Sequence, residues 1–527
     1  MRGVFSRVLL SAVLCLSSAA AQTRAGAAAA SDDLQASLKK FTSFLNTVEQ
    51  DFADPIDTDR AIYQGAIPTM LRTLDPHSNF FDPKAYQLLR EDQAGRYYGV
   101  GMLVGSPEGK VIVMYPFLGS PAYKAGLHPG DTILAVNGVS CEGLDIPAVS
   151  GMLKGPQGTR VRIKAGRYGH PDPLWFDVVR GEVPRDSVTY AFWYQPGIAY
   201  IKLEGFNENT GREFEKALNA LGEPNIDGLI LDLRDNPGGI LQEAVDVADH
   251  FLQKGQTIVS HHGRTSEETR FTAKRGERGR QYPIVVVVNH SSASAAEILA
   301  GALQDHDRAW VLGENTFGKG LVQAPYPLSE NTALLLTIAR YYTPSGRLIQ
   351  RDYSHRSFYE YYSRLSGHNN TKDMRKTDSG RTVYGGDGIA PDERYDYAAL
   401  SPWESDVVAN LTLFFFSAEY FGSHPAELDR HWKPDGALLN EFRAYAAKRG
   451  FAATDEEFRA DRDWIREHLR EEMFVTAFSK EEAERVALEN DPEIGRAVSA
   501  IPASRALLDR ARKTMARQAG GAGALEE

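Results

Sequence analysis

Apolar residues recur with different periods along the chain, and the first such pattern is helical. Five of them follow the spacing of one helix face within residues 34–52: Leu38, Phe41, Phe44, Leu45 and Val48. Helical spacing returns over residues 61–74, an Asp-Pro turn at Asp75 interrupts it, and a further helix ends near Asp92. Residues 31–95 are therefore predicted to form an N-terminal helical region.

Residues 96–182 have a different texture, in which short apolar runs alternate with glycines. The runs 98–104 and 111–115 have the length of strands, and glycine-containing turns continue to Gly138. Taken in order, Gly-Val-Gly at 99–101 and the glycine turns up to Gly138 resemble a PDZ domain. Such a module binds a terminal carboxylate with exposed backbone N–H groups while an extended peptide joins a sheet edge. The residues expected to bind substrate in this way are Gly99, Val100, Gly101 and Met102.

Residues 183–400 alternate between strand and helix patterns, which is typical of an α/β fold. The buried run 228–233 is followed by Arg-Asp-Asn-Pro-Gly-Gly at 234–239 and then by a helical pattern over 241–252. A turn at the carboxyl end of a strand is where α/β proteins commonly build sites, and paired glycines can expose N–H groups there. A plain strand-to-helix turn accounts for the same residues, so this motif alone leaves both interpretations open.

A serine-rich elbow follows the next apolar strand, 283–288, and leads into a helix over 298–303. Ser294 at such an elbow is well placed for nucleophilic attack, because the N–H groups and the positive dipole end of the helix favour developing negative charge. The alternative is that Ser292 or Ser294 only caps the helix. Further along, Lys319 lies between two glycines; a lone lysine in such a loop is more often a surface charge.

The last part of the chain is predicted to be helical over residues 401–515. Apolar stripes occur at helical spacing, among them Leu438, Leu439, Phe442 and Tyr445, and later Trp464, Ile465, Leu469 and Phe474. These stripes pack either on the core of the same chain or on a second subunit. Residues 516–527 are expected to form a disordered tail, and residues 353–376 a polar, tyrosine-rich loop without an assigned role.

The amino terminus and the composition determine the expected compartment and exclude several functions. Residues 1–21 have the charge, short apolar run and small-residue end of a cleavable signal peptide, so we expect export to the periplasm or the exterior; an uncleaved signal that holds the protein at the membrane is the alternative. No transmembrane segment is expected in the mature chain. The formal charge of -11 argues against nucleic acid as a partner. Only Cys141 lies beyond the signal, which excludes a disulfide scaffold, and no metal or organic cofactor is expected because ligand spacing is absent.

The serine, lysine and glycine motifs together resemble one family. Ser294-Ala295-Ala296-Glu297, Thr-Phe-Gly-Lys-Gly around Lys319, and Gln323 are similar to the carboxy-terminal processing peptidases, serine peptidases of family S41. The resemblance runs in order through five further segments: 74–78, 99–138, 231–239, 342–347 and 386–392. It implies a crotonase- or ClpP-like α/β catalytic core with a PDZ domain inserted before it. The domains are then expected at 96–182 for the PDZ domain and 183–400 for the peptidase core.

The resemblance also implies roles for individual residues. Ser294 would be the nucleophile, Lys319 the general base, and Gln323 the group that orients the lysine. A lysine must be desolvated to act as a base near neutral pH. The backbone N–H of Ala295 and one from Gly238 or Gly239 would form the oxyanion hole. A Ser-His-Asp triad is disfavoured because His261, His262 and His290 lack the usual surrounding signature.

Three functional hypotheses remain open from the sequence. The favoured one is an exported endopeptidase that binds the C-terminal tail of protein or peptide substrates and cuts near that end. A second is a binding or scaffold protein that keeps the fold without cleaving; its expected signature, the loss of Ser294, Lys319 or Gln323, is not found. A third is an enzyme that stays misaligned until a partner or the PDZ domain moves. Homo-oligomers and adaptors are left open as further partners.

Overall fold

The computed structural model describes residues 33–276, 280–354, 358–362, 373–424 and 427–523. The chain divides into two compact units, Met1–Asp82 and Pro83–Glu527. The predicted signal peptide and the last four residues of the predicted tail lie outside the described residues. Within those residues, no helix is both long and apolar enough to cross a membrane.

The first unit is mostly helical. Residues 33–51 form a helix, and the shorter elements α2 (Thr58–Arg60), η1 (Ala61–Ala66), α3 (Ile67–Arg72) and β1 (Asn79–Phe81) follow. Asp75 shapes the predicted turn, since its carboxylate accepts hydrogen bonds from the backbone N–H groups of His77 and Ser78 and from the Ser78 hydroxyl.

The second unit begins with α4 (Pro83–Ala94) and a small antiparallel module. Strands β2 (Arg96–Gly99) and β9 (Gly181–Pro184) pair with each other. Between them in sequence lies a sheet in the order β3-β4-β5-β7-β8, with the short β6 (Val139–Ser140) paired to β5. Its strands are β3 (Met102–Gly105), β4 (Ile112–Pro116), β5 (Thr132–Val136), β7 (Arg160–Gly166) and β8 (Leu174–Val179). Helices α5 (Pro121–Lys124) and α6 (Ile146–Leu153) complete the module, and Val113, Val136, Val149 and Ile163 are in its core. Strand β3 therefore forms one edge of this sheet.

The central sheet has the order β10-β11-β12-β15-β16-β21, and all its neighbours are parallel except the antiparallel pair β10 and β11. Its strands are β10 (Val188–Gln195), β11 (Ile198–Leu203), β12 (Gly228–Asp232), β15 (Ile284–Val288), β16 (Ala309–Gly313) and β21 (Glu393–Arg394). The run Ile-Val-Val-Val-Val in β15 is fully buried, as expected for a parallel strand that is covered on both faces. The predicted α/β fold is confirmed.

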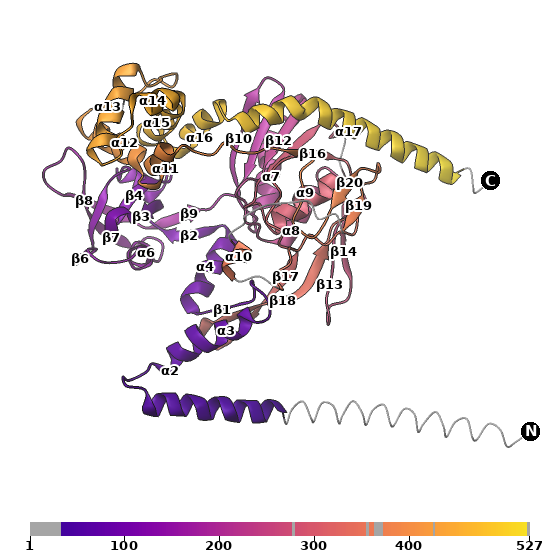
Figure 1. Ribbon diagram of the computed structural model, residues 1–527, viewed down its shortest axis with the longest axis horizontal. Coiled ribbons are helices and arrows are strands. Elements are labelled where there is room, and N and C mark those ends of the chain that lie inside the picture. Colours follow the sequence, from indigo (N-terminus) through magenta and orange to yellow (C-terminus); the bar gives the residue numbers. More distant parts are fainter. Residues whose placement is uncertain (1–32, 277–279, 355–357, 363–372, 425–426, 524–527) are drawn as a thin grey trace, which may run out of the picture. The chain divides into compact units, whose positions relative to one another are not determined.

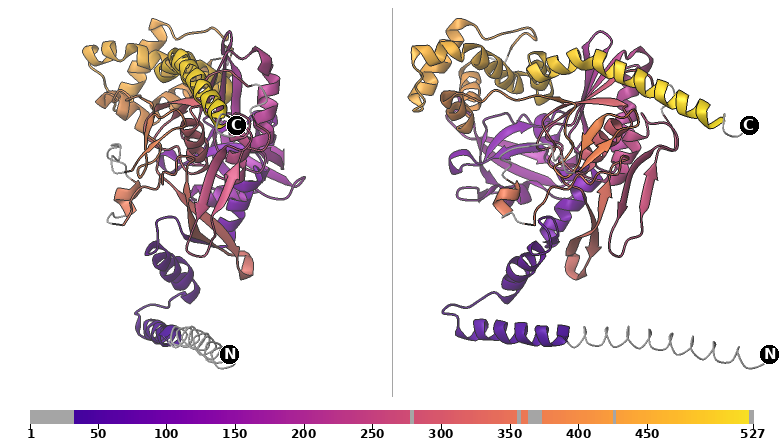
Figure 2. Two further views of the ribbon diagram at one scale, coloured as in Figure 1. Left: turned by 90° about the vertical axis from the view of Figure 1, so that its right-hand side faces the viewer. Right: turned by 45° about the vertical axis from the view of Figure 1, so that its right-hand side comes forward.

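Different helices cover the two faces of this sheet. Helices α7 (Thr210–Ala220), α8 (Leu241–Ala248) and α9 (Ala295–Asp305) share one core cluster with Leu231 and Val286. The alternate strand residues, such as Ile230 and Val285, pack against α17 (Pro492–Gly523) instead. Figures 1 and 2 show α17 in yellow, lying along the sheet. The C-terminal helix is thus a layer of the α/β core.

A second, antiparallel sheet contains β14 (Thr269–Thr272), β13 (Thr257–His262), β18 (Ala333–Tyr342) and β17 (Leu321–Pro327), paired in that order. The segment that contains Lys319 connects β16 of the central sheet to β17 of this sheet. Smaller elements follow, namely α10 (Phe358–Tyr362) and the pair β19 (Met374–Lys376) and β20 (Thr382–Tyr384).

The C-terminal helices before α17 have a core of their own. They are α11 (Pro402–Ala409), α12 (Thr412–Ser423), α13 (Gly436–Lys448), α14 (Asp455–Ala460), α15 (Arg462–Ala477) and α16 (Lys480–Glu489). The stripe residues Leu439, Phe442, Ile465 and Leu469 pack against one another in this core. Phe474 belongs to a separate cluster that contacts Tyr115 of β4. The stripes therefore pack within the chain, mostly against one another.

Candidate active site

Ser294 lies at a sharp turn between β15 and α9. Its backbone has φ 53° and ψ -112°, a conformation that a residue with a Cβ rarely adopts. Such strain concentrates at functional sites, and a strained strand-to-helix turn is the usual way to present a nucleophile. The neighbouring Ser292 has a structural role, because its hydroxyl donates to the carbonyl of Leu233 at 2.7 Å and accepts from the N–H of Asn289 at 3.0 Å.

Glu297 joins the serine elbow to the lysine segment. One oxygen of its fully buried carboxylate accepts from the backbone N–H groups of Ser294 and Lys319, both at 2.8 Å. The other oxygen accepts from the N–H of Gly318 at 2.8 Å and the hydroxyl of Thr316 at 2.5 Å. Burial raises the pKa of Glu297, and these hydrogen bonds oppose the shift. One side chain thus fixes the backbone of both predicted catalytic residues.

Tyr341 makes a second connection between the same two segments. Its hydroxyl has a single proton to donate and shares it between the carbonyl of Ser294, at 3.1 Å, and the carbonyl of Lys319. The side chain is almost fully buried, and burial raises its pKa, which keeps the hydroxyl in the form that donates. Neither Glu297 nor Tyr341 was assigned a role from the sequence.

The Gly238–Gly239 turn packs directly against the elbow. A Cβ on Gly238 would lie 2.7 Å from the Ser294 Cβ and 2.9 Å from the Ala295 nitrogen. Both glycines have positive φ, and a Cβ on Gly239 would lie 2.1 Å from the carbonyl oxygen of Phe206. Only glycine fits at these positions. The turn is also held by Asn236, whose side chain accepts from the N–H of Gly238 at 2.8 Å and whose carbonyl accepts from the N–H of Ala293 at 2.9 Å.

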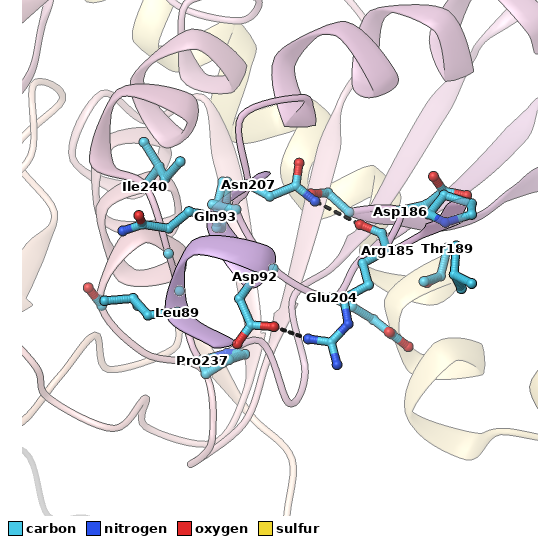
Figure 3. Close-up of a pocket in the computed structure, with 18 of the residues that line it drawn as sticks. Leu89, Asp92, Gln93, Arg185, Asp186, Thr189, Glu204, Asn207, Pro237 and Ile240 are labelled. Atoms are coloured by element: carbon cyan, nitrogen blue, oxygen red, sulfur yellow. Dashed lines mark hydrogen bonds and ion pairs between the residues drawn. The ribbon is translucent and has the colours of Figure 1, made fainter. Parts of the chain in front are cut away.

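A cavity of about 1150 Å³ contains the predicted catalytic residues. Its lining includes Ser294, Lys319, Gln323, Gly238 and Gly239. Figure 3 shows part of the wall, including Pro237 and Ile240 from the segment of the glycine turn and an ion pair between Asp92 of α4 and Arg185. No histidine lines this cavity in the part of the chain that the structure describes.

Two further regions contribute walls that sequence reasoning did not assign to the site. Leu103 and the segment 115–120 come from the PDZ-like module, and Lys480, Glu481 and Glu484 come from α16. Lys480 forms ion pairs with Glu471 and Glu484 at 3.2 and 3.3 Å. The helical periodicity of this region predicted a buried face, but it gave no sign of which groups the polar face would meet.

The four predicted tail-binding residues lie away from the cavity lining, at the start of edge strand β3. The side chains of Val100 and Met102 are buried in the core of the module. The carbonyl of Gly101 accepts from the N–H of Phe117 at 3.1 Å and from the Ser120 hydroxyl at 2.7 Å. Gly101 has φ 78°, and a Cβ there would lie 2.5 Å from the Ser120 Cβ. The predicted binding loop thus does not itself line the cavity, but it is bonded to Phe117 and Ser120, which do.

The three histidines weighed as possible bases lie outside the cavity lining, and His261 packs beside Phe271. The His290 ring bonds to Glu314 at 2.8 Å with its side chain 58% exposed, and His262 stacks on Tyr342. Among the described residues, no group of three or more His, Cys, Asp or Glu side chains could hold a metal ion.

Comparison with known proteins identifies the two modules. Residues 112–167 match the PDZ domain model, and residues 197–354 match the model of peptidase family S41. A carboxy-terminal-processing protease of Bartonella bacilliformis is 39% identical over 300 residues, which cover 56% of this chain and 68% of that protein. The corresponding protein of Synechocystis is 40% identical over 292 residues, 54% of this chain and 68% of its own.

Two further relatives extend the comparison. The carboxy-terminal processing protease CtpB of Bacillus subtilis is 33% identical over 327 residues, 62% of this chain and 68% of its own. Among solved structures, a photosystem II D1 C-terminal processing protease aligns with 68% of this chain and 87% of its own at 29% identity and a TM-score of 0.36. The family resemblance seen in the sequence is therefore confirmed: the chain belongs to peptidase family S41 and is a protease that carries a PDZ domain.

Proposed function

We propose that this protein is an exported serine endopeptidase that cuts protein substrates near their C-terminal end with a Ser294 and Lys319 dyad. The observation that carries the proposal is the shared carboxylate of Glu297, which binds the backbone of both residues at the wall of one cavity. A nucleophile and its base must keep a fixed separation, and a common buried acceptor supplies that constraint.

The reaction follows from the roles of these groups. Neutral Lys319 takes the proton from the Ser294 hydroxyl as its oxygen attacks the scissile carbonyl, and Gln323 orients the lysine. The departing amine then receives this proton from Lys319, and water, activated in the same way, releases the acyl group from Ser294.

The tetrahedral oxyanion would be bound by the N–H of Ala295 and one N–H of the glycine turn, each contributing about 3 kcal/mol to the barrier reduction. The N–H of Gly238 is already donated to Asn236. Use of Gly238 as the second donor therefore requires that this bond be given up when substrate binds, whereas use of Gly239 does not.

Recognition of the substrate tail is assigned to the PDZ module. Strand β3 is at a sheet edge and follows the Gly99–Met102 loop directly, an arrangement suited to a peptide that adds as a strand and ends in a carboxylate. The relatives are named carboxy-terminal processing proteases, in agreement with this specificity. Because Leu103 and Phe117 of the same module line the cavity, movement of the module would also change access to Ser294.

Cleavage of casein by the full-length mature protein tests the dyad, with mass spectrometry of the products. We expect Ser294→Ala and Lys319→Ala each to lower the rate by about a thousandfold or more. Circular dichroism should show that both variants remain folded. Efficient cleavage by folded Lys319→Ala would overturn the assigned base. An inactive, folded wild type would instead favour either gating or the binding-protein alternative. Addition of a peptide with a free C-terminus separates these two, because it should activate a gated enzyme but not a binding protein.

A further inference from the structure

The start of α17 forms a buried ion cluster with the loop that follows β12. The Arg234 guanidinium donates to Asp491 at 2.8 Å and to Glu493 at 2.9 Å. The same guanidinium bonds to Asp232 at 2.6 Å, at the end of β12. Asp232 and Glu493 are fully buried, so these charges are largely shielded from solvent. Arg234 is therefore held between the central sheet and the C-terminal helix.

Arg234 also lies at the start of the loop that carries the glycine turn, two residues after the end of β12. The loop is tied to the serine elbow at two points beyond Arg234. The N–H of Asp235 donates to Asn289 at 2.9 Å, and the carbonyl of Asn236 accepts from Ala293 at 2.9 Å, one residue before the nucleophile. Hydrogen bonds joined by short stretches of backbone thus connect α17 to the serine elbow.

We propose that Asp491 and Glu493 are positioning residues for catalysis, which act by fixing Arg234. The two carboxylates hold the guanidinium from the side opposite the sheet and so limit movement of the glycine turn against the elbow. The inference rests on the proposed function, because it assumes that this turn supplies a donor to the oxyanion. The helix α17 lies outside the segment that matches the peptidase family model.

Glu493 differs from Asp491 in a way that makes the two separable. Among the described residues its Oε1 is a buried atom without a hydrogen-bond partner, whereas Asp491 also caps α17 by accepting from the N–H groups of Glu493 and Ile494. Burial raises the pKa of Glu493 to about 7. The charged and titratable groups that face it are Arg234, Asp232, Asp491, Tyr395 and Tyr397, whose hydroxyl donates to Glu493 at 2.5 Å.

The test compares Glu493→Gln with wild type in the full chain, measuring kcat and KM for a fluorogenic peptide between pH 5.5 and 9. The glutamine mimics the protonated acid, so Arg234 keeps Asp232 and Asp491 but loses one charged partner. Above pH 8 we expect kcat to fall about tenfold with KM within about twofold, since small displacements of catalytic groups have effects of this order. The ratio of the two kcat values should decline toward one below pH 6, with its midpoint near pH 7. Ionisations that are the same in both proteins cancel in this ratio.

Two companion variants complete the experiment. Asp509→Asn removes an exposed acid from the same helix and should leave kcat unchanged at every pH. Asp491→Asn keeps a good cap for α17 but removes one charged partner of Arg234, so kcat should fall about tenfold. Because this variant retains Glu493, the ratio of its kcat to that of wild type should change little or not at all near pH 7.

A Glu493→Gln variant with wild-type kcat at all pH values, or with a pH-independent loss that matches a lower melting temperature, would overturn the inference. Failure of the proposed function looks different. In that case wild type is inactive, or Ser294→Ala still cleaves.

Discussion

The central sheet and the PDZ-like sheet differ in how far their strands are covered. Strands β12, β15 and β16 are covered by α7, α8 and α9 on one face and by α17 on the other. In the PDZ-like sheet, β3 is an edge strand, and Leu103 on it is 43% exposed. Catalysis requires atoms at fixed positions, whereas strand addition requires an unpaired edge. The difference in covering therefore matches the different tasks proposed for the two sheets.

The two regions also differ in how they hold the backbone of their functional segments. A buried carboxylate, Glu297, accepts four hydrogen bonds from the serine and lysine segments. The PDZ loop at Gly101 is held by neutral groups, namely the N–H of Phe117 and the hydroxyl of Ser120. Hydrogen bonds to a charged, buried acceptor are the stronger kind. We therefore expect changes at the catalytic anchor to have the larger consequences.

Among the substitutions that test this comparison, the largest effect is expected from Glu297→Gln. The amide places an NH₂ group where an oxygen now accepts two hydrogen bonds, so two donors face another donor. Each buried unsatisfied group costs about 1–3 kcal/mol. We expect kcat to fall about a hundredfold or more, because the backbones of Ser294 and Lys319 lose their common anchor, and the melting temperature to fall as well. Steady-state kinetics and thermal unfolding measure the two effects.

Glu314→Gln is the matched control. Glu314 lies in the same loop as Lys319 but bonds to the exposed His290 outside the cavity, so kcat should stay within about twofold of wild type. If Glu297→Gln retained wild-type kcat, the shared carboxylate would not be what aligns the dyad, and the contrast with the PDZ loop would fail.

The sequence predicted more about the catalytic segment than about what holds it in place. Ser294, Lys319 and Gln323 were identified by resemblance, and the structure places all three at one cavity. Glu297 was visible in the same motif, but an acid in the first turn of a helix is explained equally well as a local cap. Its bond to Lys319, 22 positions away, is visible only in three dimensions.

The role of the C-terminal helices could not be predicted for a similar reason. Periodicity shows that a helix has an apolar face, but not which surface covers that face. The ion pairs of Arg234 span 257 positions to Asp491 and 259 to Glu493. No local pattern connects segments so far apart. Sequence reasoning therefore found the helices but not their place against the central sheet and the cavity.

A smaller effect, confined to binding, is expected from Gly101→Ala. The new Cβ would clash with Ser120 at 2.5 Å in a backbone conformation that alanine avoids, and this would distort the loop before β3. For substrates with a free C-terminal carboxylate we expect KM to rise about tenfold, equivalent to about 1.4 kcal/mol, with kcat nearly unchanged. A substrate with an amidated C-terminus should show no such difference between variant and wild type.

Gly126→Ala separates crowding from backbone strain in the same module. Gly126 also has positive φ, 84°, but nothing lies within 4 Å of a Cβ placed there. The Gly126→Ala substitution should lower the free energy of unfolding slightly and leave KM unaffected. Equal effects of the two substitutions on KM would show that strain alone, rather than the shape of the loop, limits binding, and the PDZ loop would then lose its assigned role.

The smallest effect concerns stability at acidic pH and comes from a buried polar group of the α/β core that lacks a hydrogen-bond partner within the part of the chain that the structure describes. His250 at the end of α8 is 2% exposed, and among the described residues its Nε2 is a buried atom without a hydrogen-bond partner. Burial, with Arg280 and Arg275 nearby, lowers its pKa to about 4. Since an unfolded histidine titrates near 6.5, the unfolded chain binds a proton between pH 6.5 and 4 that the folded chain does not.

Stability is therefore lost as pH falls through this window, and at pH 5 the loss from His250 should be about 2 kcal/mol. Urea unfolding of wild type and His250→Gln at pH 7 and pH 5 isolates the contribution of His250 to this loss, because glutamine cannot ionise. The packing change against Phe214 and Phe251 is common to both pH values and therefore cancels. Wild type should lose about 2 kcal/mol more than the variant. Parallel losses would mean that the folded chain accommodates the charged imidazole.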